Sequence, residues 1–218
     1  VIGKENIPKN GRAIFVGNHA GFLPLDALVL LNTVRRYRNE PLKVRALFED
    51  FFMNFPFLGT FLSRIGGIKG NFERAKKMLS NEMLVVNFPE GVLGISKPYS
   101  KRYQLQRFGR GGFIRLAYET KSPIVPVAII GSEEAFPLLA KILLPKNIMS
   151  YFPFFPFTFT FPWFGVFGFL PLPVRWKIIF GQPLTQYQQD IDSSRANIVQ
   201  NVMDVKDVIN GMIEQELH

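Results

Sequence analysis

The chain has 218 residues, with 26 Lys or Arg against 17 Asp or Glu, so its formal net charge is +9. Hydrophobic residues make up 47% and charged residues 20%, a balance that excludes disorder as the main state and is sufficient for one sizeable core. The lack of cysteine excludes disulfides and thiol catalysis, and favours a cytosol-facing compartment. The positive charge and the 23 phenylalanines together suggest an anionic membrane surface as a partner.

Short apolar strands alternate with amphipathic helices along the chain. After a turn at 8–11, residues 12–16 form an apolar β run, and a helix begins at Asp26. We expect further strands at 43–47, 83–88, 124–130 and 175–180, and helices at 51–63, at 71–79 with Asn71 as its cap, at 113–119 and, amphipathic, in the C-terminal region after 190. This order is typical of an α/β domain with a mixed, mostly parallel sheet flanked by helices, and we expect residues 1–218 to form one domain.

A charge-free stretch between Lys146 and Arg175 is long enough to span a bilayer. Its prolines prevent a continuous helix in lipid, so we interpret residues 147–174 as an irregular apolar excursion. Three roles are open for its phenylalanines and Trp163: insertion into the membrane interface, an acyl-chain tunnel, or a cap on the core. No signal-peptide pattern follows Val1, and a membrane anchor before it is compatible with the sequence. We expect a peripheral or anchored membrane protein on the cytoplasmic face.

Histidine is scarce, because apart from the C-terminal His218 the chain contains only His19. It follows the first strand in a loop, and Asp26 comes seven positions later at the start of a helix. Such loops carry the active-site groups of many α/β proteins. An imidazole can take the proton of a hydroxyl group, and a carboxylate behind it fixes its tautomer. The pair by itself is also compatible with a structural loop histidine beside a helix N-cap.

Three ordered blocks resemble the glycerolipid acyltransferase family, which includes the 1-acylglycerol-3-phosphate acyltransferases. They are Asn18-His19 with the downstream Asp26, Phe88-Pro89-Glu90-Gly91, and Ile124-Val125-Pro126-Val127; residues 67–74 fit a fourth block more loosely. The resemblance covers about residues 8–182. It implies transfer of a fatty acyl group from acyl-CoA or acyl carrier protein to a glycerolipid hydroxyl, with His19 as general base, Asp26 orienting it, and no cofactor.

Substrate-binding candidates lie in and near these blocks. The resemblance implies that Arg74 binds the acceptor's phosphate, and that Glu90 binds the acceptor's glycerol hydroxyls or phosphate region. Asn18, Gly91 and Lys97 are further candidates, and backbone amides near Gly17 or Gly91 are candidates for holding the thioester oxyanion. Lys97 opens a basic, glycine-interrupted run that suits a CoA phosphate, an acidic carrier protein or lipid headgroups, or is simply a solvated face; its other cations are Lys101, Arg102, Arg107, Arg110 and Arg115.

Two departures from the family pattern leave the acceptor open. The family commonly places Asp five residues after His, but Pro24 stands there and the carboxylate arrives at Asp26, a spacing that resembles the mono- and diacylglycerol acyltransferases. Val92 replaces the usual Thr or Ser. The net charge favours 1-acylglycerol-3-phosphate as acceptor. The alternatives are a neutral glyceride or long-chain alcohol, or a lipid-binding module without catalysis.

Other site classes find no support in the sequence. One internal histidine, no cysteine and scattered carboxylates give no ligand spacing for a metal. A Gly-x-Ser-x-Gly elbow, a dinucleotide motif and a P-loop are also missing. We expect membrane lipids and the acyl donor as partners, and no nucleic acid, because the basic residues are dispersed.

Overall fold

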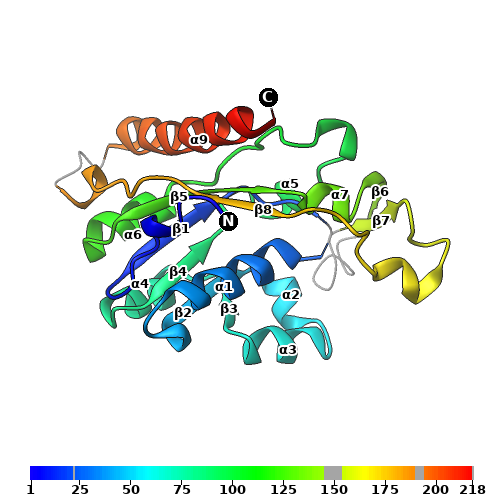
Figure 1. Cartoon of the computed structure of the whole chain (residues 1–218), viewed down its shortest axis with the longest axis horizontal. Helices are drawn as coiled ribbons and strands as arrows, with labels where there is room; N and C mark the ends of the chain where they lie inside the picture. Colours follow the sequence, from blue (N-terminus) through cyan, green and yellow to red (C-terminus); the bar gives the residue numbers. More distant parts are fainter. Residues whose placement is uncertain (22, 145–153, 190–193, 218) are drawn as a thin grey trace.

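The computed structural model describes the whole chain except residues 22, 145–153, 190–193 and 218. Its centre is a six-stranded sheet with the order β3-β2-β4-β1-β5-β8 (Figure 1). The strands are β1 (Ala13–Gly17), β2 (Val44–Phe48), β3 (Gly67–Lys69), β4 (Leu84–Asn87), β5 (Ile124–Ile130) and β8 (Lys177–Phe180). Each neighbouring pair is parallel except β5 and β8, which are antiparallel. The predicted mixed, mostly parallel sheet is therefore confirmed.

Helices cover both faces of this sheet (Figure 1). One core includes α1 (Leu25–Tyr37), α2 (Asp50–Asn54) and α3 (Leu58–Arg64), and the other includes α4 (Phe72–Ser80), α6 (Gly112–Thr120) and α9 (Arg195–Leu217). Strand β1 shows why: Phe15 packs in the first core, while Ile14 and Val16 pack in the second. Since successive side chains of a strand point to opposite faces, such a central strand is apolar throughout.

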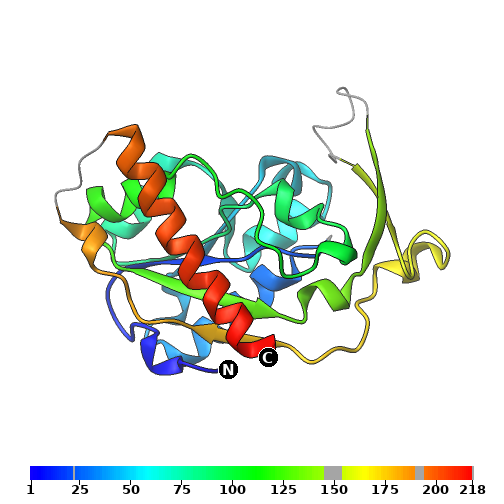
Figure 2. The same cartoon turned by 90° about the horizontal axis from the view of Figure 1, so that it is seen from above.

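Short elements connect these layers. They are α5 (Val92–Ile95), α7 (Ser132–Ala135) and the 3-10 turns η1 (Lys4–Asn6), η2 (Pro41–Lys43), η3 (Tyr99–Lys101), η4 (Gly165–Phe169) and η5 (Gln186–Gln188). Seen from above, α9 runs obliquely across its face of the sheet (Figure 2). Its buried residues are Val202, Val205, Ile209 and Ile213. The predicted C-terminal amphipathic helix is thus confirmed, as is the cap of α4, where the Asn71 side chain accepts a hydrogen bond from the Arg74 N–H.

The single helix predicted at 51–63 is wrong. The chain instead forms α2 and α3, separated at Phe55-Pro56-Phe57. A proline disfavours helical dihedrals in the residue before it, and Phe55 is extended with ψ 129°. Phe57 then takes a positive φ of 62°. The apolar spacing was compatible with one helix, but Pro56 decides the break.

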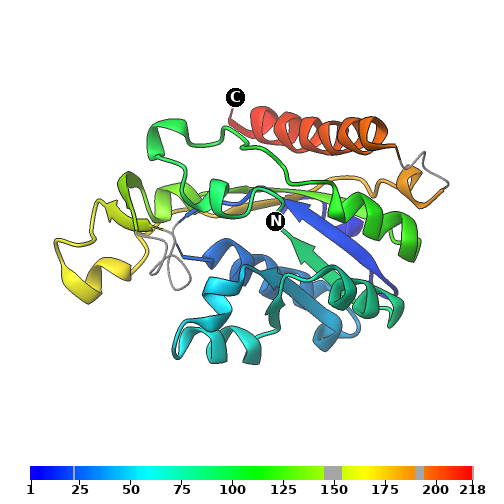
Figure 3. The ribbon, with the colours of Figure 1, turned by 180° about the vertical axis from the view of Figure 1, so that it is seen from behind.

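The interpretation of residues 147–174 as irregular is also partly wrong. Residues 147–153 lie outside the described part of the chain, but Phe154–Thr158 is a strand, β7, paired antiparallel with β6 (Leu138–Leu143). Proline is tolerated in such an edge strand, and Pro156 sits within β7. The β6–β7 hairpin and η4 project from one end of the molecule (Figures 2 and 3).

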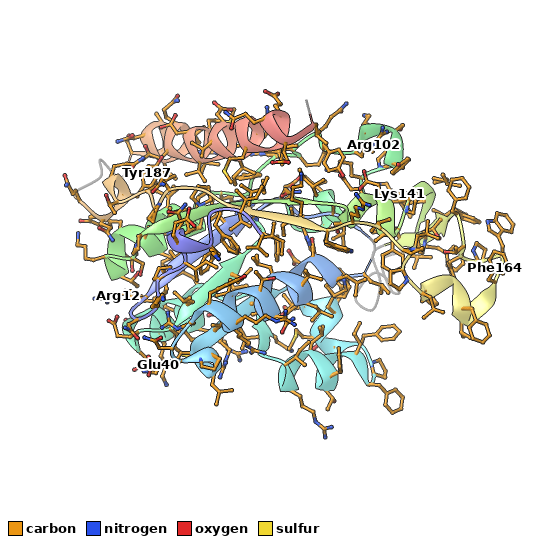
Figure 4. The ribbon with its side chains drawn as sticks, in the orientation of Figure 1. Arg12, Glu40, Arg102, Lys141, Phe164 and Tyr187 are labelled. Atoms are coloured by element: carbon orange, nitrogen blue, oxygen red, sulfur yellow. The ribbon has the colours of Figure 1, made fainter. Side chains whose placement is uncertain are left out.

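Most apolar side chains of this projection face outward. Phe154 is buried, but Trp163, Phe164 and Phe167 are each about two thirds or more exposed. A role as a core cap is therefore excluded for these three. We call the more than half-exposed side chains of this region the apolar tip: Leu139, Ile142, Leu143, Phe159, Trp163, Phe164, Val166, Phe167 and Leu170. Phe164 lies at its outer end (Figure 4). No helix among the described residues is both long and apolar enough to cross a membrane.

Candidate active site

A cavity of about 320 Å³ lies where β1, β2 and β4 end. His19, which follows β1, lines it together with Glu49 after β2 and Phe88 after β4. The starts of α4 and α6 complete the wall, at Asn71 and at Gly111-Gly112. Ligands of open α/β sheets bind at the carboxyl ends of the parallel strands. The sheet thus brings His19 to the position where such proteins react with their substrates.

The structure brings His19 and Asp26 together. His19 Nδ1 lies 2.6 Å from Asp26 Oδ2, and the Asp26 side chain is fully buried. The same carboxylate accepts the backbone N–H groups of Ala20 at 3.0 Å and Ala27 at 2.7 Å. Both carboxylate oxygens of Asp26 act only as hydrogen-bond acceptors, so the group that faces them must be a donor. The imidazole proton therefore belongs on Nδ1, and Nε2 is left with a free lone pair.

The imidazole is held in place from a second side. The Phe88 ring stacks on it, with ring centroids 4.6 Å apart and an angle of 22° between the planes. Nε2 makes no hydrogen bond with any residue that the structure describes. The His19 side chain is only 8% exposed, but it lines the cavity. An oriented imidazole with a free nitrogen beside a cavity is the arrangement that a general base requires.

Asn18 does not fit the predicted role in substrate binding. It is buried, its Nδ2 donates to the Ile129 carbonyl at 2.9 Å, and its Oδ1 accepts the Ile129 N–H at 2.7 Å. Both ends of the amide are therefore used by one backbone residue of β5. Asn18 fixes the His19 loop against β5, and it is not among the residues that line the cavity.

Glu90 likewise has a structural position that the sequence did not predict. It is 3% exposed; its Oε1 accepts the His19 N–H at 2.9 Å, and its Oε2 accepts the Gln106 N–H at 2.6 Å. The carboxylate therefore supports the His19 backbone, and Glu90 is not among the residues that line the cavity. Gly91 does line the cavity, with φ 51° and ψ −136°, a conformation that essentially only glycine adopts. Its N–H donates to the Phe88 carbonyl and is not available to an oxyanion.

Lys97 and Arg74 both lie away from the cavity wall. Lys97 Nζ pairs with Glu133 Oε1 at 2.7 Å, donates to the Gln104 carbonyl, and is almost fully buried. Burial raises the pKa of the Glu133 carboxyl, and the Lys97 ammonium opposes that rise. Lys97 therefore holds the fold together rather than a substrate. Arg74 is exposed on α4, while Arg110 is the arginine that lines the cavity.

Sequence reasoning missed two cavity groups, Glu49 and Asp50, and one packing position, Gly94. Glu49 and Asp50 line the cavity, and neither forms an ion pair within the described residues. Their signal was a pair of carboxylates that begins two residues after the predicted strand at 43–47. Arg110, which the sequence places in a basic run suited to anions, lines the cavity as well. Gly94 in α5 packs so closely that a Cβ there would lie 2.5 Å from the His19 carbonyl oxygen. No signal in the sequence pointed to this contact, because no helix was predicted at 92–95.

Comparisons with known proteins identify the family of this chain. A family model described as Acyltransferase matches residues 1–130. Uncharacterized proteins of Mycobacterium tuberculosis and Mycobacterium leprae are 38% and 37% identical to the chain over 218 residues, which is 100% of the chain and 60% and 59% of theirs. The human protein named "DGAT1/2-independent enzyme synthesizing storage lipids" is 25% identical over 100% of the chain and 64% of its own length. The chain thus spans about three fifths of these relatives.

A solved structure shows the same fold. The crystal structure of the 1-acyl-sn-glycerophosphate acyltransferase PlsC from Thermotoga maritima matches with a TM-score of 0.56, over 96% of this chain and 69% of that one, at 20% identity. The family model covers more than half of the chain and contains the His19 and Asp26 pair. The chain therefore belongs to the acyltransferase family, as its resemblance to the glycerolipid acyltransferases predicted.

Proposed function

We propose that the protein is an O-acyltransferase that moves a fatty acyl group from a thioester donor, acyl-CoA or acyl carrier protein, to the hydroxyl group of a lipid. The observation that carries this proposal is the 2.6 Å contact between His19 Nδ1 and the buried Asp26 carboxylate, with Nε2 free beside the cavity. This contact assigns the proton to one imidazole nitrogen and the basic lone pair to the other.

The residues support a direct transfer. His19 Nε2 takes the proton of the acceptor hydroxyl as its oxygen attacks the thioester carbonyl, and a tetrahedral intermediate forms. The C–S bond then breaks, the thiolate leaves, and the imidazolium returns the proton to the sulfur. Asp26 stabilises the imidazolium through Nδ1. No covalent acyl-enzyme is required, and the acceptor hydroxyl itself is the nucleophile.

The start of α6 suits the negative charge that develops on the thioester oxygen. Gly111 is the N-cap of this helix and has no side chain to accept its first N–H groups. Gly111, Gly112 and Arg110 line the same cavity as His19. Unpaired N–H groups at a helix start carry partial positive charge and bind anions. We therefore assign the oxyanion to these amides rather than to the paired N–H of Gly91.

The local charge favours a neutral acceptor. Glu49 and Asp50 both line the cavity, where Arg110 is the cationic side chain among the lining residues that the structure describes. Two carboxylates repel a phosphate monoester but accept hydrogen bonds from glyceryl or alcohol hydroxyls. Arg74, which the resemblance assigned to the phosphate, is absent from the wall. We therefore propose a monoacylglycerol, diacylglycerol or long-chain alcohol, as the storage-lipid name of the human relative also suggests.

The second candidate acceptor is 1-acylglycerol-3-phosphate, the first expectation from the sequence. Arg110 and the start of α6 are the positive groups that favour it, and the similarly folded PlsC is named for that substrate. A panel of acceptors decides between the two. Purified protein is incubated with long-chain acyl-CoA and vesicles containing lysophosphatidate, monoacylglycerol, diacylglycerol or fatty alcohol, and products are identified by mass spectrometry.

Two variants make this panel diagnostic. His19→Ala removes the base and is expected to lower transfer by about 10²–10⁴-fold; a folded His19→Ala protein with full activity would sink the mechanism. Glu49→Gln with Asp50→Asn removes two negative charges and is expected to raise lysophosphatidate use relative to monoacylglycerol use. An unchanged ratio between the two acceptors means that these carboxylates do not select the substrate.

We also propose that the apolar tip inserts into the membrane that carries the acceptor. Exposed aromatic side chains with Trp163 among them are typical of membrane interfaces. Phe164, at the outer end of the tip, lies far from the sheet (Figure 4). Trp163→Ser with Phe164→Ser and Phe167→Ser is expected to weaken binding to vesicles in a flotation assay. Leu42→Ser, which changes an exposed side chain on η2, is the control. Equal binding of both variants would leave the tip without this role.

A further inference from the structure

A second groove lies between the segment before α6 and the N-terminal half of α9. Its volume is about 250 Å³. One wall consists of residues 107–110, and the other of α9 side chains Ile198, Val199, Val202, Met203 and Lys206. Figure 3 shows this segment running below α9 before it enters α6. Of the side chains that line this groove, the proposed function uses only Arg110.

Three cations surround the groove: Arg107, Arg110 and Lys206. Within the described part of the chain, none of them pairs with a carboxylate. Asp207 follows Lys206 directly, but neighbours in sequence do not face each other on a helix. Three unpaired positive charges around one concave surface attract a ligand with several negative charges.

The α9 wall adds an apolar surface next to these charges. Val199 and Met203 are one helical turn apart and 55% and 43% exposed, so they form one open apolar strip. A free phosphate would leave this strip unused. The groove therefore fits a ligand that combines phosphates with a flat, weakly polar ring system.

The groove is joined to the catalytic cavity. Gly109 and Arg110 line both of them, so a ligand can extend from one to the other along the side-chain-free backbone at Gly109. The groove also lies near the opposite end of the molecule from the β6–β7 hairpin (Figure 2). A ligand in this groove thus approaches on the side away from the apolar tip, which argues for a water-soluble ligand and against a lipid headgroup.

We propose that this groove binds the nucleotide end of an acyl-CoA donor. Its phosphates lie against Arg107, Arg110 and Lys206, its adenine packs on Val199 and Met203, and its pantetheine arm passes Gly109 so that the thioester reaches His19. This assignment rests on the proposed acyl transfer and selects acyl-CoA rather than acyl carrier protein as donor.

The first test compares donors with and without the nucleotide. Transfer is measured with palmitoyl-CoA and with palmitoyl-pantetheine, and the ratio of the two kcat/KM values is taken for each variant. Arg107→Gln with Lys206→Gln is expected to lower this ratio by about tenfold, since it removes two of the three cations that line the groove. Lys4→Gln with Lys9→Gln removes the same charge outside both cavities and keeps the ratio. An unchanged ratio in the groove variant would overturn the proposal.

A second measurement does not depend on turnover. Binding of free CoA is measured by calorimetry at low and at 0.5 M salt, for the wild type and both double variants. We expect weaker binding in the groove variant and at high salt. CoA binding that depends on the groove but without transfer to any acceptor means that the groove assignment stands and the proposed reaction fails. An unaltered donor ratio, or equal CoA binding by both double variants, means that the groove assignment fails. Transfer from palmitoyl-CoA in that case means that the proposed reaction still stands.

Discussion

Gly94→Ala tests whether the position of the His19 backbone controls the reaction. A Cβ at this site would lie 2.5 Å from the His19 carbonyl oxygen and 2.9 Å from the His19 Cβ, while ordinary contacts begin at 3.4 Å. The His19 loop must therefore move by about 0.9 Å or α5 must shift by as much. A misplacement of about 1 Å costs a reaction roughly 10²-fold in rate, so we expect a loss of that order in kcat with a smaller change in KM.

The assay separates this displacement from unfolding. Transfer from palmitoyl-CoA is measured beside the circular dichroism and the midpoint of urea unfolding, and we expect about 1–3 kcal/mol of destabilisation from overpacking. Gly211→Ala is the matched control, because a Cβ there meets nothing within 4 Å on α9 and is expected to add about 0.5–1 kcal/mol of stability with full activity. A folded Gly94→Ala protein with wild-type kcat would refute the reasoning that α5 fixes the base.

Three further predictions follow from the same contacts. Asp26→Asn places an N–H donor where two backbone N–H groups and His19 Nδ1 need an acceptor, so we expect kcat to fall by about 10²–10⁴-fold. Glu5→Gln, which changes an exposed residue near the N-terminus, is the control and is expected to leave kcat unchanged. Glu90→Gln leaves either the His19 or the Gln106 N–H unpaired, and chemical denaturation should show a loss of about 1–3 kcal/mol together with slower transfer. The hydrogen bond from Lys76 holds the pKa of the Glu119 carboxyl below its ordinary value. The pair therefore stabilises the fold at pH values above the ordinary pKa, and this stabilisation is lost as pH falls through the lowered pKa. An NMR titration of Lys76→Gln should find the Glu119 pKa higher than in the wild type, and an unchanged Glu119 pKa would contradict the contact.

The local pattern was a good guide where neighbouring residues decide the structure. The strand at β1, the helix that begins near Asp26 and the Asn71 cap depend on residues within a few positions of one another. The break between α2 and α3 was also local, because Pro56 marks it, but the apolar spacing received more weight than the proline. Strand β3 was missed, since three residues are too short to show a period.

The roles of the polar motif residues depended on distant partners. Asn18 pairs with Ile129, 111 positions away, and Glu90 reaches back 71 positions to His19. In the sequence both looked like exposed loop residues that are ready for a substrate. Their burial arises only when the β1 loop, β5 and the loop before α5 meet at one end of the sheet, where each polar group must find a partner.

The sequence by itself determined the class of protein: an α/β domain, an imidazole followed by a carboxylate after the first strand, and the motifs of the acyltransferase family. These features are carried by residue type and spacing along the chain. Only the tertiary structure decided which groups face the cavity. The ends of β1 and β2 and the start of α6 bring His19, Glu49 and Arg110 together from separate segments. It also decided that the Lys97 side chain is buried against Glu133, since the free energy of a buried charge depends on the partner that the fold supplies.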